Sequence, residues 1–584
     1  MKLLKKIIEP SIEIIFKNYN LEYNDYKNLI QIPRDTDVCD LCIPCFSLSK
    51  ILKKSPVQIA DEIASKAKEI IKEDISINSI NGYVNFYSEP KWLINKIIFE
   101  KYEFFKNNSK SNLLIEHTSA NPNGPFHVGR ARNAILGDAL VRLNRDYGNK
   151  VQAEYYVDDM GKQVGILAWA IENLTKEDVE KSLKKEGIDN LNPMWQNKED
   201  HVRVRWYQAA NILRKDNQNI ESELSEMINK SEEGDIEVLK QFNDAFQPIL
   251  DGMLETLSKL GIKYDSFTNE SQFITDGSVS KIMDDLKSSG LYGVAENGAK
   301  YLELENKGVS GKSTKFFYQR GDGSSLYATR DLAYHKWKWT KSDKLINVLG
   351  EDHRLQSKQV SIALNELNIK SPEVIFYAFI KLPAGKMSTR KGNVVFMDDL
   401  IYEAEELALQ ILNDRKKEIE KTQAIKIAKA VASSAIRFNI LKVSPEKGFT
   451  FKWEDALSFD ADSAPFIMYS HARSCSIKKK VESLEYIEKE IDLNNIELND
   501  SISKLLRTIM RYEDNIEKSI NENKPNHFCL YLLELSNAYN AFYRDCTIIN
   551  DNEVNDLFFK VSEYSRKIIN RGCRALGIIP LDSM

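Results

Sequence analysis

The stretch that most constrains the fold of this chain runs from residue 113 to residue 157. LLIEH (113–117) is a short apolar run typical of a buried strand, and a loop rich in Asn, Pro and Gly follows it. Residues 127–148 place apolar side chains at helical spacing, and VQAEYYV (151–157) is a second strand candidate. Strand, loop, helix and strand in this order predict a βαβ unit, the seed of a Rossmann-type, doubly wound parallel sheet.

The chain is too long for one domain, because its 584 residues exceed the ~100–200 of a typical domain several times. We expect a small α+β domain over 1–105, a parallel-sheet domain over 106–445 and an all-α domain over 446–584. A charged, helix-patterned stretch at about 170–260 predicts a helical insertion in the second of these.

Local patterns support this division. The stretch 55–71 begins with Ser-Pro and has helical spacing, and 80–87 alternates like a strand after a Gly turn. Strand-like runs return at 344–353 and 373–382, and the chain beyond about 400 is almost wholly helix-patterned.

Composition indicates an ordinary globular protein without a membrane span, because no run of ~18 uncharged apolar residues occurs. Glu9, Pro10 and Glu13 interrupt the apolar start, so we expect no signal peptide and a cytoplasmic location. The net charge of −5 argues against a surface coated in positive charge, although local patches could still bind RNA.

Cysteine usage points to reduced thiols, since the seven cysteines are an odd number in a chain without a secretory signal. Cys39, Cys42 and Cys45 have a metal-site spacing, but the next Cys or His is His117 and a tetrahedral site needs a fourth ligand. We therefore predict buried cysteines and no metal site.

Two segments have features of nucleotide-handling loops. Asn121 and Gly124 lie in a loop that lets a ligand approach the backbone, and the helix beginning at His127 offers free N–H groups to an anion. GKMSTRKGN (385–393) contains three cations, two hydroxyls and flanking glycines, which could close over a triphosphate. In isolation, a structural histidine and a solvated basic loop are the simpler interpretations.

Together the two segments resemble the class I aminoacyl-tRNA synthetases. HVGR (127–130) resembles their HIGH motif and KMSTR (386–390) their KMSKS motif, in the expected order and about 255 residues apart. TSANPNGPFHVGRARNAILGDAL (118–140), YYVDDMGKQ (155–163) and SLYATRDLAYH (325–335) resemble signatures of the arginine-specific family. FKWEDALSFDADSAPFIMYSHARSCSI (451–477) resembles the entry to that family's anticodon-binding domain, and residues 1–105 resemble its domain that contacts the tRNA core.

The resemblance implies an arginine–tRNA ligase with L-arginine, ATP and tRNA(Arg) as partners, Mg²⁺ accompanying the ATP and no tightly bound metal. It also implies that adenylate formation needs bound tRNA. A guanidinium has five donors in a plane, so its pocket needs carboxylates in fixed geometry. By resemblance, the residues that contact arginine are Glu116, Ser119, Asn121, Glu270, Tyr327, Asp331 and Gln356.

The same resemblance places ATP on two regions of the chain. The implied ATP-binding residues are His127, Gly129, Asn133, Gly350, Asp352, His353, Lys386, Met387 and Ser388. The implied catalytic residues are His127, Arg130, Lys386, Arg390 and Lys391. Arg130 replaces the second His of HIGH and Thr389 the second Lys of KMSKS, so we expect Arg390 or Lys391 to supply the missing charge.

RNA contacts are expected from the C-terminal helices, where cations and aromatic residues could bind phosphates and stack on bases. The candidates are Arg437, Lys442, Arg473, Lys478, Lys479, Lys480, Tyr469, Tyr539, Phe542 and Tyr543. Helix-spaced aromatics are more often core residues. One alternative to an arginine–tRNA ligase is another class I synthetase or a related nucleotidyl-transfer enzyme, and the second is a catalytically impaired tRNA-binding relative. We expect the chain to be a monomer.

Overall fold

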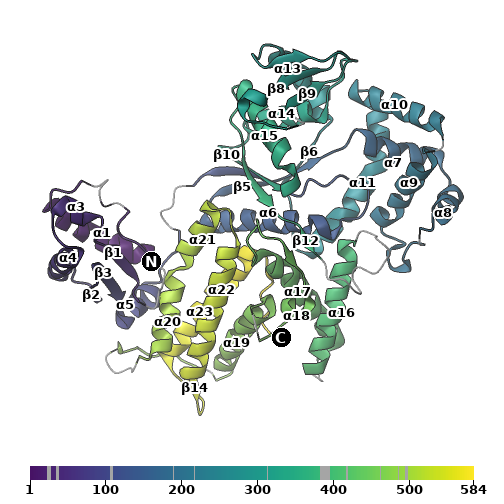
Figure 1. Ribbon diagram of the computed structural model, residues 1–584. Helices are drawn as coiled ribbons and strands as arrows, with labels where there is room; N and C mark the ends of the chain where they lie inside the picture. Colours follow the sequence, from purple (N-terminus) through teal and green to yellow (C-terminus); the bar gives the residue numbers. More distant parts are fainter. Residues whose placement is uncertain are drawn as a thin grey trace. The chain divides into compact units, whose positions relative to one another are not determined.

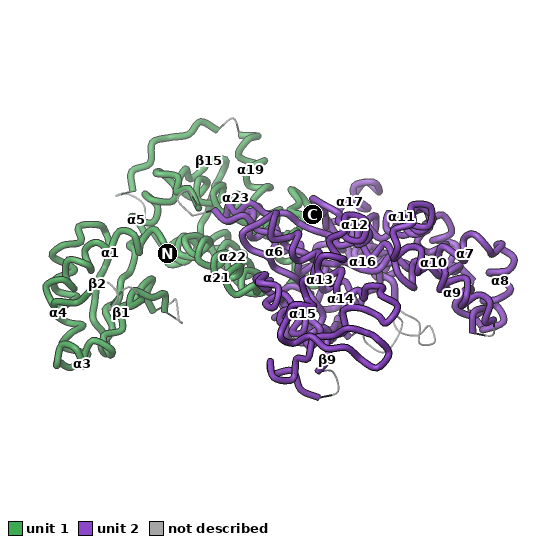
Figure 2. The backbone as a smooth tube through the Cα atoms, turned by 90° about the horizontal axis from the view of Figure 1, so that it is seen from above, with its two compact units in different colours: residues 1–108, 458–584 green, residues 109–457 purple. Residues whose placement is uncertain are grey.

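The computed structural model describes residues 1–22, 26, 28–33, 38–105, 110–188, 190–215, 217–311, 314–381, 395–415, 419–460, 462–484, 486–493 and 498–584. Its contacts divide the chain into two compact units (Figure 2). Unit 1 consists of Met1–Asn108 and Ser458–Met584, and unit 2 is Ser109–Leu457. No helix in the described parts of the chain is both long and apolar enough to cross a membrane.

Unit 2 is built on a parallel sheet of five strands in the order β11-β10-β4-β5-β6. Figure 1 labels β5, β6 and β10 of this sheet. The strands are β4 (Asn112–Glu116), β5 (Lys150–Val157), β6 (Ser266–Asn269), β10 (Lys344–Gly350) and β11 (Glu373–Tyr377). Ile115 pairs with Ile346 on one side and with Ala153 on the other. All strands run in one direction, so their carboxyl ends share one edge, where ligands of such sheets bind.

Helix α6 (Val128–Tyr147) connects β4 to β5 and completes the predicted βαβ unit. It ends at Gly148, whose φ of 102° is a left-handed conformation that favours glycine. Leu136 and Leu140 pack with Leu113, Ile115 and other strand residues in one apolar cluster. The close approach of helix and loop depends on Gly137, because a Cβ atom there would lie 2.2 Å from the His117 side chain.

Two groups of further elements lie between the strands of this sheet in the sequence, one helical and one of mixed helices and strands. The helical one contains α7 (Lys162–Asn173), α8 (Lys176–Lys185), η2 (Pro193–Trp195), α9 (Glu199–Leu213), α10 (Gln218–Glu232) and α11 (Ile236–Lys259). It begins earlier than the sequence suggested, because α7 starts directly after Gly161, which has a left-handed φ of 88°. A Thr175–Asp178 capping box begins α8 and the Asp235 carboxylate caps α11, as helix-start chemistry predicts.

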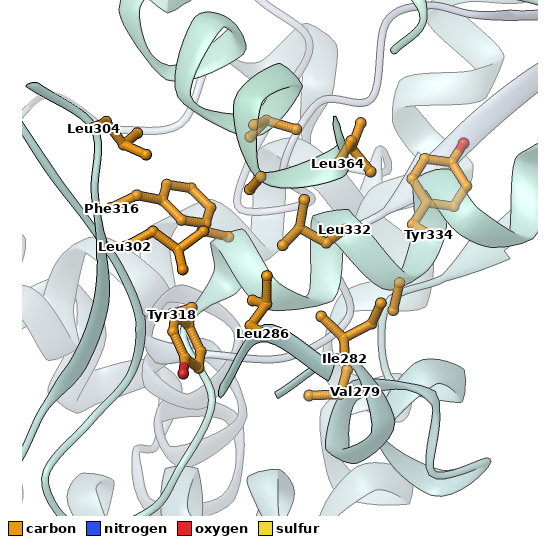
Figure 3. Packing of buried hydrophobic residues seen from close by; sticks show 14 of the residues in the cluster. Val279, Ile282, Leu286, Leu302, Leu304, Phe316, Tyr318, Leu332, Tyr334 and Leu364 are labelled. Carbon is orange, nitrogen blue, oxygen red and sulfur yellow. The ribbon is translucent and has the colours of Figure 1, made fainter. Parts of the chain in front are cut away.

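The second insertion packs around helix α14 (Tyr327–Lys338). Its elements are α12 (Gln272–Thr275), α13 (Ser278–Lys287), β7 (Tyr292–Val294), β8 (Lys300–Glu303), η3 (Glu305–Lys307), β9 (Lys315–Gln319), η4 (Glu351–His353) and α15 (Arg354–Glu366). Leu332 is fully buried among Leu286, Leu302, Phe316 and Leu364 (Figure 3). This apolar packing fixes α14, whose polar side chains are thereby held at defined positions.

The last part of unit 2 contains β12 (Ile380–Lys381), α16 (Met397–Arg415), α17 (Lys421–Leu441), β13 (Phe449–Thr450) and α18 (Trp453–Ala456). Arg437 of α17 is fully buried, and its Nη2 atom lies 2.5 Å from Asp138 Oδ2 of α6. Its Nη1 donates to the carbonyl of Leu260 at 3.0 Å. The expectation that Arg437 contacts RNA phosphates is therefore wrong, because a buried, paired guanidinium cannot reach them.

The first segment of unit 1 is a small α+β domain with the antiparallel sheet β1-β3-β2. Its elements are α1 (Lys2–Lys17), β1 (Leu41–Pro44), α3 (Leu48–Leu52), α4 (Pro56–Ile70), β2 (Ile75–Ile80), β3 (Tyr83–Ser88), α5 (Pro90–Ile94) and η1 (Asn95–Phe99). A capping box between Ser55 and Gln58 begins α4, which confirms the helix expected there. Cys39, Cys42 and Cys45 are all buried.

The second segment of unit 1 is a helical domain. It contains α19 (Ala464–Glu482), α20 (Asp500–Met510), α21 (Tyr512–Asn521), α22 (Asn526–Asp545), β14 (Ile549–Asn550), β15 (Glu553–Val554) and α23 (Asp556–Leu576). The fold class is as predicted: a parallel-sheet domain with a helical insertion, an α+β N-terminal domain and a helical C-terminal domain.

Candidate active site

The loop that leaves β4 has a strained backbone held by hydrogen bonds. Thr118 and Ser119 have φ values of 72° and 39°, a left-handed conformation rare for residues other than glycine. The Thr118 N–H donates to Asn133 Oδ1 at 2.7 Å, and Asn133 Nδ2 donates to the Val348 carbonyl at 2.9 Å. Tyr264 also donates to Thr118 Oγ1 at 2.6 Å. Asn133 thus joins the loop to β10, and its amide is engaged at both ends.

Glu116 and Ser119 are brought together at the carboxyl end of β4. Ser119 Oγ donates to Glu116 Oε1 at 3.2 Å and accepts from the Tyr156 N–H at 3.2 Å. The other carboxylate oxygen of Glu116 accepts a hydrogen bond from the fully buried Lys338 at 2.7 Å. Asn121 lies farther along the loop, where its Nδ2 donates to Gln163 at 3.0 Å.

His127 precedes the first turn of α6 as its N-cap and is half-buried. Burial, followed by the charge of Arg130, lowers the pKa of His127 to about 4, so the imidazole is neutral near pH 7. A Cβ atom on Gly129 would lie 3.0 Å from His127 Nδ1, so glycine leaves room for the ring. The positive dipole end of this helix and a neutral imidazole suit an anionic ligand.

The described residues before and after the KMSTR segment (386–390) contact the start of α6 or α6 itself. Val128 N–H donates to the Val395 carbonyl at 3.0 Å, and Met397 N–H donates to the Phe126 carbonyl at 2.7 Å. β12, on the other side, contacts α6 and pairs with β13. Lys386, Met387, Ser388, Arg390 and Lys391 themselves lie outside the described residues.

A buried acidic cluster lies beyond β5 and β6. Glu270 follows β6 and forms an ion pair with Arg330 of α14, and Asp158 is hydrogen-bonded to Glu270. Glu232 Oε1 lies 3.7 Å from Arg330 Nη1. Burial raises the pKa of Glu270 to about 8 and that of Asp158 to about 6, although Arg330 opposes both shifts. Arg320 pairs with Glu232 at 3.0 Å, so Glu270 and Asp158 are two carboxyl groups that share the one remaining cation, Arg330.

Tyr156 lies among these acidic groups. Its ring stacks on Tyr334 with centroids 4.1 Å apart. Burial raises the pKa of Tyr156, and the charges of Glu270 and Asp331 add to that rise. The buried Tyr156 hydroxyl makes no hydrogen bond within the described parts of the chain. A phenol that lacks a partner beside carboxylates is suited to a ligand with several N–H donors.

Helix α14 brings Tyr327 and Asp331 to the same side, one turn apart. Tyr327 is 60% exposed, and the Asp331 side chain is 31% exposed. Burial alone would raise the pKa of Asp331, but His335 and Lys338 hold it below its ordinary value. Asp331 is therefore an anion at neutral pH that remains accessible to a ligand.

A third group follows β10. Gly350 ends this strand, where a Cβ atom would lie 2.4 Å from Asp352 Oδ1. Asp352 and His353 are exposed, and Gln356 lies 3.3 Å from His353 Nδ1. These residues follow β10 at the carboxyl edge of the sheet.

Sequence reasoning did not identify Asp158, Tyr156, Arg330 and Lys338 as site residues. A usable signal existed for the first two, because YYVDD continues a predicted parallel strand past its carboxyl end. Arg330 and Lys338 lie in a predicted helix, where lysine and arginine are usually solvated. Only the tertiary structure shows that both are buried against carboxylates.

Three family models match successive parts of the chain. Residues 2–88 match the arginyl tRNA synthetase N terminal domain, and 93–453 match the class I (R) tRNA synthetase catalytic domain. Residues 467–584 match the DALR anticodon binding domain. An arginine–tRNA ligase of Archaeoglobus fulgidus is 37% identical over 96% of this chain and 97% of its own length. One of Methanocella arvoryzae is 38% identical over 92% of each chain.

Solved structures share the fold. The arginyl-tRNA synthetase of Thermus thermophilus superposes with a TM-score of 0.78 over 100% of both chains at 22% identity. That of Plasmodium falciparum has a TM-score of 0.73 at 17% identity, covering 100% of this chain and 99% of its own. With the full-length identity and the matched domains, these findings show that the chain belongs to the arginyl-tRNA synthetase family of class I aminoacyl-tRNA synthetases.

Proposed function

We propose that this chain activates L-arginine with ATP and transfers the arginyl group to the terminal ribose of tRNA(Arg). Family membership gives the class of reaction, arginine–tRNA ligation. The observation that carries the substrate assignment is the acidic cluster, in which Arg320 pairs with Glu232, while Glu270 and Asp158 share the buried Arg330. A second guanidinium, that of the substrate, would neutralise the surplus negative charge.

We assign the guanidinium to Glu270, Tyr327 and Asp331, with the Tyr156 hydroxyl as a further acceptor. The two oxygens of Glu270 provide about four acceptor positions, so its contact with Arg330 leaves room for substrate donors. The α-amino and carboxylate groups are assigned to Glu116, Ser119, Asn121 and Gln356. Lysine would leave several of these acceptors unpaired, since an ammonium lacks the planar fork of donors.

ATP is assigned to the start of α6, with His127, Gly129 and Arg130 facing the phosphates and Gly350, Asp352 and His353 bordering the nucleotide. Asn133 would act indirectly here, because its amide holds Thr118 and Val348. Lys386, Met387, Ser388, Arg390 and Lys391 are proposed to meet the triphosphate. Mg²⁺ would be held mainly by the phosphates: within the described chain, the two groups of three candidate metal ligands contain none of these residues.

The reaction has two steps, and neither needs a side-chain nucleophile. A carboxylate oxygen of arginine attacks the α-phosphorus of ATP, and the bond to the leaving pyrophosphate breaks. A terminal ribose hydroxyl of the tRNA then attacks the arginyl carbonyl and AMP leaves. The protein would contribute by orienting the reactants and by stabilising phosphate charge, for which the helix start and the basic segment are suited.

Aminoacylation by the purified chain with ATP and unmodified tRNA(Arg) tests this proposal. We expect attachment of labelled arginine and at least ~100-fold weaker use of lysine. Attachment of another amino acid but not arginine would identify a different class I synthetase. Binding of tRNA without attachment of any amino acid would indicate a catalytically impaired relative.

The raised pKa values of Glu270 and Asp158 predict a pH-dependent KM for arginine. The guanidinium stays charged throughout, and it binds the ionised carboxylates best. Because these groups lose protons as the pH rises from about 6 to about 8, KM for arginine should fall roughly tenfold over this interval. Aminoacylation kinetics at saturating ATP measure this. Glu270→Gln should flatten the dependence; an equally steep profile in that variant would exclude Glu270 as its cause.

The helical domain offers a surface suited to RNA. Arg473 of α19 lies between two tyrosine rings, 4.9 Å from the centroid of Tyr469 and 4.8 Å from that of Tyr543. These rings are 42% and 38% exposed, whereas Tyr539 and Phe542 are fully buried core residues. We therefore assign base stacking to Tyr469 and Tyr543 and phosphate contact to Arg473, with Lys479 and Lys480 nearby in sequence.

Replacement of Tyr469 by Ala should raise KM for tRNA about tenfold, because stacking of one base on an aromatic ring contributes roughly 1–3 kcal/mol. Kinetics at varied tRNA and saturating arginine and ATP provide the measurement. Tyr402→Ala is the matched control, since that tyrosine of α16 is also 42% exposed. An equal effect of both replacements would remove Tyr469 from the RNA-binding surface.

We further propose the domain division 1–105, 106–445 and 446–584, with the first domain contacting the tRNA core and the third the anticodon region. The chain is proposed to act as a monomer in the cytoplasm. Light scattering of the purified chain with and without tRNA would check the oligomeric state, and localisation of a tagged chain would check the compartment.

A further inference from the structure

A row of buried polar groups connects β4, β10 and α14. Lys338 is fully buried, and its Nζ donates to Glu116 Oε2 at 2.7 Å and to Asn347 Oδ1 at 3.0 Å. Asn347 Nδ2 lies 3.0 Å from His335 Nε2. His335 Nδ1 lies 2.8 Å from the backbone oxygen of Asp331 and 3.1 Å from its Oδ1. The row therefore begins and ends at a carboxylate of the proposed arginine site.

The chemistry of these groups fixes the proton on His335. A lysine ammonium can only donate, so the Asn347 side chain must turn its oxygen toward Lys338. Its NH₂ group then faces His335 Nε2, which must accept. The ring proton is consequently on Nδ1, and it points at Asp331. A neutral histidine in this tautomer can orient the carboxylate without cancelling its charge.

We infer that His335 is a positioning residue, which acts through Asp331 to set the orientation of the arginine side chain. This inference rests on the proposed function of the site. His335 holds one oxygen of Asp331, and the other, Oδ2, makes no hydrogen bond within the described structure. That oxygen is available to a guanidinium. Lys338 of the same helix donates to Glu116, which we assign to the α-amino and carboxylate end of the substrate arginine.

The geometry predicts a specific kinetic effect for His335→Leu. Loss of the Nδ1 donor frees Asp331 to rotate, so KM for arginine should rise about 10- to 100-fold. KM for ATP and KM for tRNA should stay within about twofold. His335→Asn places an amide nitrogen near the position of Nδ1 and should recover most of the arginine affinity. Lys336→Met is the matched control. Lys336 lies next to His335 in α14, but its side chain is exposed and faces Asp285 of α13.

A second variant tests the tautomer even if His335→Leu does not fold. Asn347→Asp keeps the side-chain volume but replaces the donor that faces Nε2 by an acceptor, which favours a charged imidazole beside Asp331. KM for arginine should rise at least fivefold in this variant too. Circular dichroism and thermal unfolding identify which variants are folded.

Three results would overturn the inference. They are unchanged KM for arginine in folded His335→Leu, no recovery in His335→Asn, or equal rises in KM for arginine and ATP. Each presupposes a wild-type chain that attaches arginine to tRNA. Absence of that activity in the wild type would instead contradict the proposed function.

Discussion

Asp331→Ala is expected to lower kcat/KM for arginine by roughly 10²- to 10³-fold, while KM for ATP stays within about twofold. Removing one partner of a hydrogen-bonded, partly buried charge pair costs about 2–5 kcal/mol. Asp331 is suited to such a pair, because His335 and Lys338 keep its pKa low against the effect of burial. The carboxylate therefore stays ionised at every pH at which the assay is practical.

Aminoacylation kinetics measured at varied arginine concentration give kcat/KM for arginine, and those at varied ATP concentration give KM for ATP. Asp331→Asn keeps the size of the side chain but removes its charge, and it should lose most of the same activity. Asp285→Ala is the control, because Asp285 is an exposed carboxylate whose Oδ2 lies 3.8 Å from Lys336 Nζ. Unchanged arginine kinetics in Asp331→Ala would remove this residue from the pocket.

The sequence predicted those parts of the fold that depend on local chemistry. The strand, loop, helix and strand from 113 to 157 have strong periodicity and turn residues, and they appear as β4, α6 and β5. β6 was not predicted, since it has only four residues and pairs with β5 far earlier in the chain. Short strands gain their stability from neighbours that the local sequence does not reveal.

The site was only partly predictable for a related reason. Tyr327 and Asp331 are one helical turn apart, so a shared side follows from sequence spacing. Glu270 and Arg330 are 60 residues apart, and their ion pair forms only when the fold brings the residue after β6 next to α14. Likewise, no pattern in the sequence indicates that Lys338 is buried beside Glu116, 222 residues away. The partner of a buried charged residue is set by the tertiary structure and cannot be identified from the local sequence.

Arg437 was assigned a wrong role because the sequence does not show whether a cation in a helix is exposed or buried. In the sequence it is a cation in a helix-rich region, which is compatible with RNA contact. In the structure it is fully buried between Asp138 and the Leu260 carbonyl. Burial alone would raise the pKa of Asp138, yet Arg437 and Arg142 hold it below its ordinary value. Arg437 is thus part of the contact between α17 and α6.

We expect Arg437→Leu to lower the free energy of unfolding of unit 2 by about 3–5 kcal/mol, because it leaves the buried Asp138 without its main partner. Urea denaturation provides the measurement. Lys426→Leu, an exposed position on the same helix, should change stability by less than ~0.5 kcal/mol. The double variant Arg437→Leu/Asp138→Leu should regain part of the loss, since the buried carboxylate that lost its main partner is removed as well. If Arg437 contacted RNA instead, Arg437→Leu would raise KM for tRNA and leave urea unfolding unchanged.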